Sequence, residues 1–197
     1  MAGIGLSKPY YAQYSNDGTT VTYSKGGLMG RYTELNISIN EASANTLHGD
    51  NGPAELDNQF NSGTAAISTD ELLAGNMVDV FGAKKVPIDA AGISSADANW
   101  YVFDDDQTIP YLGIGGIIKK KINGAIKWMA FVLPKVQFKN PGIVATTQGE
   151  TISWQTQSLT ADILRSDDIK HTWFRISSAL ESEADAEKAI KAMLNIA

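Results

Sequence analysis

Few residues in this 197-residue chain have the types and spacing that chemistry requires. The chain contains no cysteine, which excludes thiol chemistry and disulfides. Its two histidines, His48 and His171, do not lie in a pattern of zinc ligands. No Gly-x-Ser-x-Gly motif marks a serine nucleophile. We therefore expect no catalytic residue, no bound metal, no cofactor and no enzyme activity.

Two short runs are candidate ligand-binding loops. The run GIGG at residues 113–116 resembles a dinucleotide loop, but it lies inside an apolar run and not between a strand and a helix. Glycines in a strand more often allow a backbone or a large ring to approach closely. Asp104, Asp105 and Asp106 lack the alternating acids, central glycine and late glutamate of a calcium loop. We expect a solvated turn there, or a docking site for lysines.

The glycines belong to a predicted hairpin over residues 111–138, YLGIGGIIKKKINGAIKWMAFVLPKVQF. Asn123-Gly124 supplies the two positive-φ residues of a type I′ turn. A two-residue turn places Lys119 opposite Trp128. Both faces of the hairpin are apolar near its base, so both need a cover. We expect one face to lie on the core of its own chain. The other face should lie on a neighbouring copy, and it carries Ile117, Ala130 and Val132.

Charge is unevenly distributed along the chain, whose formal net charge is −6. Residues 107–149 contain no acid, so the rest of the chain carries all 22 acidic and 10 of the 16 basic residues. A segregated basic segment can bind nucleic acid or an acidic surface on another copy. We favour another copy, because the segment lacks arginine and the acidic remainder would repel phosphate. The charged candidates for this subunit interface are Asp104, Asp105, Asp106, Lys119, Lys120, Lys121 and Lys127.

The remaining sequence is typical of one domain with an extension. Residues 1–18 are predicted to form an N-terminal arm, packed on its own domain or on a neighbour, and residues 19–197 a single domain. Residues 32–40 alternate as a half-buried strand. Residues 43–63 form a hairpin or a projecting loop. Helices are predicted shortly after Asp70 and over residues 183–195.

Two further expectations concern the core and the membrane. All four tryptophans lie on predicted strands, so we expect Trp100, Trp128, Trp154 and Trp173 to pack in the core. The sequence has no apolar run near the roughly 20 residues of a membrane span. Its first residues lack the basic region and apolar core of a signal peptide. We expect no membrane partner.

Three segments, in their order and spacing, resemble the major tail protein family of long-tailed, non-contractile phages of Gram-positive hosts. They are AISTDELLAGNMVDVFGAKK (66–85), PYLGIGGIIKKKINGAIKWMAFVLPKVQF (110–138) and PGIVATTQGETISWQTQSLTADI (141–163), followed by a WFRI strand and an Ala-rich helix. The resemblance implies a mainly β, sandwich or barrel-like fold with a flanking short helix and a C-terminal helix. Six copies would form a ring, in which the inner-wall strands close into a barrel, and rings would stack into a tube.

The resemblance also implies a structural virion protein of the tail, assembled in the host cytoplasm. Its partners would be further copies of itself, the tape-measure protein and DNA in the lumen, and tail terminator and baseplate proteins. The alternatives left open are the tube of a contractile tail or secretion-like device, and a secreted carbohydrate-binding β-sandwich. Lumen-facing candidates are Glu34, Asn36, Ser38, Asn40, Glu55, Asp57 and Gln59. Candidates for a loop between rings are Asp50, Asn51, Gly52 and Pro53.

Overall fold

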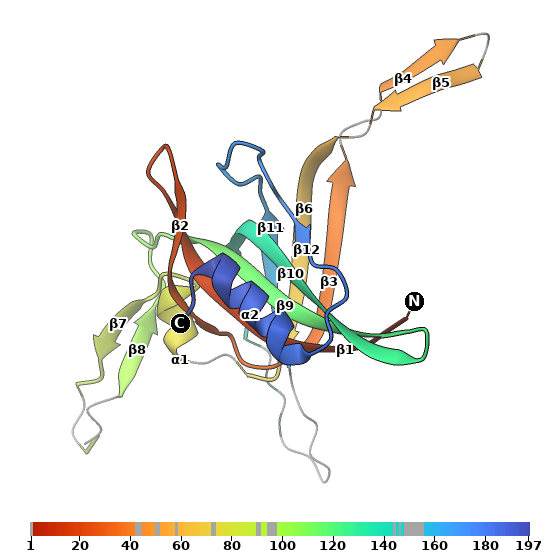
Figure 1. The fold of residues 1–197 in the computed structure, drawn as a ribbon. Coiled ribbons are helices and arrows are strands. Elements are labelled where there is room, and N and C mark those ends of the chain that lie inside the picture. The colour runs from red at the N-terminus through yellow and green to blue at the C-terminus, as the bar shows by residue number, and fades with distance from the viewer. Residues whose placement is uncertain are drawn as a thin grey trace.

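The computed structural model shows a mainly β protein built on one large antiparallel sheet (Figure 1). It describes residues 2–41, 45–49, 52–57, 59–71, 74–89, 92–93, 98–143, 145, 147 and 156–197. The strands are β1 (Ala2–Asn16), β2 (Val21–Leu28), β3 (Tyr32–Glu41), β4 (Asn45–Gly49), β5 (Gly52–Asp57), β6 (Phe60–Thr69), β7 (Lys84–Pro87), β8 (Asn99–Val102), β9 (Tyr111–Ile122), β10 (Ala125–Phe138), β11 (Gln157–Ile163) and β12 (Arg175–Ile176). The helices are α1 (Ala74–Asp79) and α2 (Glu183–Leu194).

Within the described residues, the large sheet has the order β2-β1-β9-β10-β11-β6-β3, and β12 pairs with β10. Residues 2–16 of the expected arm form β1, an interior strand between β2 and β9, in agreement with the alternative that the arm packs on its own domain. Tyr11 of β1 lies in the main core, while Tyr10 and Ala12 lie in the second cluster beside α2. Burial on both faces explains why this segment is a strand of its own domain.

The predicted hairpin is confirmed as β9 and β10. Asn123 and Gly124 have φ of 50° and 84°, and Lys119 pairs with Trp128 as the two-residue turn requires. The close-approach interpretation of the β9 glycines is also confirmed. A Cβ on Gly116 would lie 2.7 Å from the ring of Tyr32. Only glycine leaves room for such a ring without a shift of the buried side chains.

Two apolar clusters cover the two faces of this hairpin. The main core is built from β1, β9 and β10 together with β3, β6, β11 and the segment that contains α1. On the opposite face, α2 lies across β1, β9 and β10 (Figure 1). The structure contradicts the assignment of Ile117, Ala130 and Val132 to a subunit interface. These three side chains are buried in the cluster with Ala186, Ile190 and Leu194 of α2, so their cover comes from the same chain.

The helix α2 begins and ends where its caps predict. The Ser182 hydroxyl accepts a hydrogen bond from the Asp185 backbone N–H at 3.1 Å. Asn195 adopts the left-handed conformation with φ of 51° and closes the last turn. Its buried residues recur at helical spacing, at Ala186, Ile190 and Leu194. This apolar stripe fixes the side of α2 that meets the sheet.

Two ribbons extend from the body in Figure 1. In the first, β4 pairs with β5 inside the segment 43–63 that the sequence predicts as a hairpin or a projecting loop. Residues 60–63 belong to β6, and Asp50 and Asn51 lie outside the described residues. The second pairs β7 with β8. Trp128 and Trp173 pack against the two apolar clusters as expected, and Trp154 lies outside the described residues. The expectation for Trp100 is wrong, because its side chain is 62% exposed on β8.

Candidate assembly surfaces

The strand β3 presents the alternation that the sequence predicts. Glu34, Asn36, Ser38 and Asn40 are exposed, while Leu35, Ile37 and Ile39 pack against the main core. Two neighbouring strands extend this surface, because Asn36 pairs with Ala66 of β6 and Ala66 pairs with Thr160 of β11. We name this surface the polar face, and its residues are Glu34, Asn36, Ser38, Asn40, Ser62, Thr64, Ala66, Ser68, Ser158, Thr160 and Asp162.

The polar face consists mainly of small, uncharged side chains. Its charged members are Glu34 and Asp162, and Lys139 lies 3.3 Å from the Asp162 carboxylate. Sequence reasoning missed the contributions of β6 and β11. The alternation of Ser62 and Thr64 with buried Gly63 and Ala65 is the signal that would have revealed β6.

The large sheet ends at β2 on one side and at β3 on the other. Each end strand has one strand neighbour among the described residues, β1 for β2 and β6 for β3. The outer edge of such a strand is a template for pairing with another chain. The polar face therefore lies next to an edge that a second copy can extend.

The lysine-rich end of the β9–β10 hairpin, named the basic tip, comprises Lys119, Lys120, Lys121 and Lys127. The register places Lys120 opposite Lys127, as predicted. An ion pair with Glu181 neutralises Lys127. Lys121 is exposed and lies between Ile126 on one side and Ala2 of β1 on the other. The basic tip therefore presents lysines where the ends of the three paired strands β1, β9 and β10 meet.

The predicted acidic interface residues form a turn after β8. Lys84 of β7 lies 2.8 Å from the Asp104 carboxylate and 3.7 Å from that of Asp106. The hydrogen bond from Lys84 holds the pKa of Asp104 below its usual range. In Figure 1 the β7–β8 ribbon and the basic tip lie at opposite ends of the molecule. The chain therefore does not bring its own acidic turn to its own basic tip.

The remaining candidates lie on or beside the β4–β5 ribbon. Gly52, Pro53, Glu55 and Asp57 belong to β5, and Gln59 is an exposed residue just before β6. The ribbon continues from the ends of β3 and β6 and extends beyond the sheet (Figure 1).

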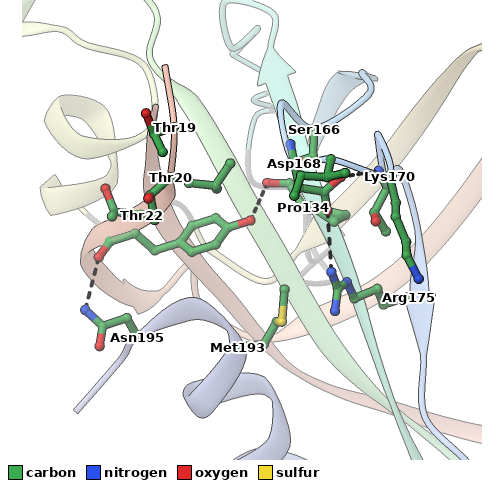
Figure 2. A pocket seen from close by; sticks show the side chains of 14 residues that line it. Thr19, Thr20, Thr22, Pro134, Ser166, Asp168, Lys170, Arg175, Met193 and Asn195 are labelled. Atoms are coloured by element: carbon green, nitrogen blue, oxygen red, sulfur yellow. Dashed lines mark hydrogen bonds and ion pairs between the residues drawn. The ribbon is translucent and has the colours of Figure 1, made fainter. Parts of the chain in front are cut away.

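A hollow of about 600 Å³ lies between the start of β2, the end of α2 and the loop after β11 (Figure 2). The Tyr23 hydroxyl donates to the Pro134 carbonyl at 2.9 Å, and burial raises the pKa of Tyr23. Arg175 lies 3.5 Å from the Asp168 carboxylate. Burial opposes the lowered pKa of Asp168, but hydrogen bonds from Thr172 and the charge of Arg175 outweigh it. The hollow is thus lined by the Asp168–Arg175 ion pair and by the hydroxyl groups of serine, threonine and tyrosine side chains.

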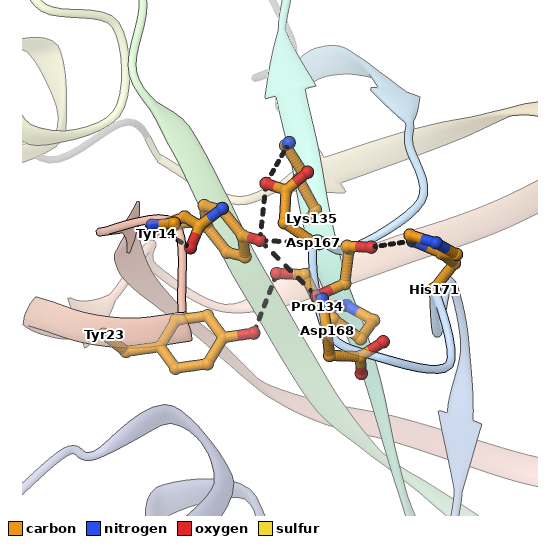
Figure 3. A network of polar contacts seen from close by, with 10 residues as sticks. Tyr14, Tyr23, Pro134, Lys135, Asp167, Asp168 and His171 are labelled. Atoms are coloured by element: carbon orange, nitrogen blue, oxygen red, sulfur yellow. Dashed lines mark hydrogen bonds and ion pairs between the residues drawn. The ribbon is translucent and has the colours of Figure 1, made fainter. Parts of the chain in front are cut away.

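A polar network beside this hollow fixes the loop after β11 to β1 and β10 (Figure 3). The Tyr14 hydroxyl donates to the Asp167 carboxylate at 2.9 Å and accepts from the Asp167 backbone N–H at 2.9 Å. Lys135 donates to the same carboxylate at 2.7 Å. His171, predicted to ligate no metal, contacts the Ser166 carbonyl through Nδ1 at 3.2 Å. These contacts anchor the loop after β11, and this structural role accounts for the network.

In the described part of the chain, no group of three or more His, Cys, Asp or Glu residues gathers as a metal site. The helices in those same ranges do not combine the length and the apolar character that crossing a membrane requires. The comparisons with protein-family models and with curated proteins found no match for this chain.

Proposed function

We propose that the chain is the tube subunit of a long, non-contractile phage tail, and that copies of it form rings that stack around a DNA-conducting channel. The observation that carries this proposal is the polar face, which is broad, has small side chains and lies beside an open sheet edge. The order of segments that resembles the tail protein family supports the same function.

A channel for DNA needs a wall to which phosphate does not adhere. Phosphate contacts are made mainly by lysine and arginine, and each one adds to the affinity. On the polar face the side chains are serine, threonine, asparagine and alanine with two carboxylates, and the adjacent Lys139 is paired with Asp162. Such a wall hydrates well and offers few cations to DNA.

The end strands provide a way to close a ring. An exposed strand edge is satisfied when it pairs with an edge of another copy. A head-to-tail contact of this kind generates a closed ring when its rotation completes a circle. In the proposed ring, β3 and its neighbours line the channel, and the β4–β5 ribbons reach toward the next ring.

Electron microscopy of the purified full chain at high concentration tests the proposal. Rings or tubes with a central channel are expected. The channel wall is identified with Asn36→Cys, because the chain has no cysteine of its own. A bulky polymer-linked maleimide should label this variant more slowly in tubes than in monomers, while Ile169→Cys, fully exposed on a loop, serves as control. A chain that stays monomeric, even with a tail initiation complex, overturns the proposal.

A further inference from the structure

The β7–β8 ribbon carries an apolar patch that its own chain leaves uncovered. Trp100 is 62% exposed and Val86 is 43% exposed. The two residues are directly paired in the register, so their side chains lie side by side on one face of the ribbon. Exposed apolar patches mark interaction sites, and tryptophan is a common anchor in them.

An acidic turn follows β8 at the base of the same ribbon. Lys84 and Val102 form another pair on the same ribbon face, and Lys84 contacts both Asp104 and Asp106. One positive charge therefore meets two carboxylates, and exposed Asp105 adds a third. The ribbon thus carries an apolar pair, and the acidic turn lies at its base, beyond the Lys84–Val102 pair. With exposed Lys85 included, the ribbon and the turn keep a small net negative charge.

The basic tip has the complementary composition. Ile126 is 44% exposed and pairs directly with Lys121. Lys119 pairs with Trp128 on the same face, one step toward the base of the hairpin. With Lys127 occupied by Glu181, Lys119, Lys120 and Lys121 leave the tip positive. The tip thus combines an apolar residue with lysines, and the ribbon combines an apolar pair with an acidic turn at its base.

We infer that the β7–β8 ribbon of one copy docks on the basic tip of the next copy. The two surfaces lie at opposite ends of the molecule (Figure 1), so the contact is head to tail and repeats from copy to copy. Lysine stems and ammonium groups pack on the indole of Trp100, while the acidic turn faces the lysines. This inference rests on the proposed function only in taking the repeating contact to close a ring.

Cross-linking between single-cysteine variants tests the contact directly, because the natural chain has no cysteine. Asp105→Cys and Lys121→Cys are mixed under conditions in which the wild-type chain assembles, and a short bismaleimide is added. Covalent heterodimers are expected from this mixture. The matched mixture of Asp105→Cys with Ile169→Cys, which places the second cysteine on a fully exposed loop, should give background product only.

The second experiment replaces Trp100, the proposed apolar anchor. Trp100→Ser should raise the dissociation constant for self-association about tenfold, and Ile169→Ser, an equally apolar-to-polar exchange at an exposed site, should not change it. Salt of about 1 M, where the Debye length is about 3 Å, should weaken the wild-type contact. Circular dichroism verifies that the Trp100→Ser variant is folded.

The outcomes separate the two proposals. If the wild-type chain forms tubes but residues 105 and 121 do not cross-link, or Trp100→Ser assembles like wild type, the docking inference is wrong and the tube function stands. If the wild-type chain never self-associates, both are wrong. A 105–121 cross-link in open chains without rings supports the contact and counts against the tube.

Discussion

At the scale of single residues, the glycines of β9 set how closely the two apolar clusters approach the sheet. A Cβ on Gly116 would lie 2.7 Å from Tyr32 Cε2 and 2.8 Å from Phe131 Cε1, and both rings are buried. We expect Gly116→Ala to lower the free energy of unfolding by about 1–3 kcal/mol, as overpacking does. Urea denaturation measures the loss. Gly3→Ala is the control, since its Cβ would meet nothing closer than Ile118 at 3.9 Å.

The Asp167 carboxylate predicts a pH dependence. Hydrogen bonds from Lys135 and then Tyr14 lower its pKa. A carboxyl whose pKa is lower in the folded state contributes stability above its unfolded pKa of about 3.9, and this contribution is lost as the pH falls through the folded pKa. Because the Asp167 side chain is 40% exposed, solvent screening limits the contribution to about 1 kcal/mol.

Asp167→Asn should therefore be less stable than wild type at neutral pH, and the two should converge in acid. Thermal or urea unfolding at a series of pH values below about 7 measures the difference. Tyr14→Phe is the matched partial variant, because it removes the hydroxyl that donates to the Asp167 carboxylate and keeps Lys135. A gap between wild type and Asp167→Asn that does not change with pH would contradict the explanation.

At the scale of elements, α2 covers the second face of the β9–β10 hairpin, so that this cover comes from the same chain. Ile190 is fully buried against β9 and β10, and its Cγ2 would lie 2.8 Å from a Cβ on Gly115. Ile190→Ala should cost about 2–4 kcal/mol of unfolding free energy through the cavity it leaves. The loss should not depend on protein concentration, because the cover is intramolecular. Exposed Lys188→Ala on the same helix is the control.

The elements that the sequence predicts well are those with local signals. The turn at Asn123-Gly124 determined the register of β9 and β10, and the Ser182 cap located the start of α2. The position of β1 was missed, since its pairing with β9 joins residues about 100 positions apart and Gly3 and Gly5 weaken its alternation, although its pairing with β2 is local. Without β1 and α2 in place, the second apolar face looked like a subunit interface.

The candidate surfaces were predicted correctly where the signal is local and missed where it depends on long-range contacts. The alternation in β3 is local, so the exposure of Asn36 and Ser38 followed from it. The extension of that surface across β6 and β11 depends on strand order, which one sequence does not encode locally. Trp100 was assigned to the core because it lies on a predicted strand. Its exposure depends on β7–β8 standing apart from the sheet (Figure 1).

At the scale of the whole molecule, the charge of the polar face should control what passes through the proposed tube. Asn36→Lys with Ser38→Lys places two cations per copy on exposed positions of β3, so the fold should tolerate them. Each ring then multiplies the change, and phosphate contacts add up along the channel. We expect tubes to form, DNA release from particles carrying the variant to slow, and the retained DNA to be freed by high salt.

The matched control is Asn36→Gln with Ser38→Thr, which keeps the polar character without charge and should release DNA like wild type. Nuclease protection separates the two sides of the wall. DNA held in the channel resists digestion until the tube is disrupted, whereas DNA bound to the outer surface is cut at once. Digestible DNA on the lysine variant would place β3 on the outside of the tube. Unchanged release would show that the polar face does not line the path of DNA.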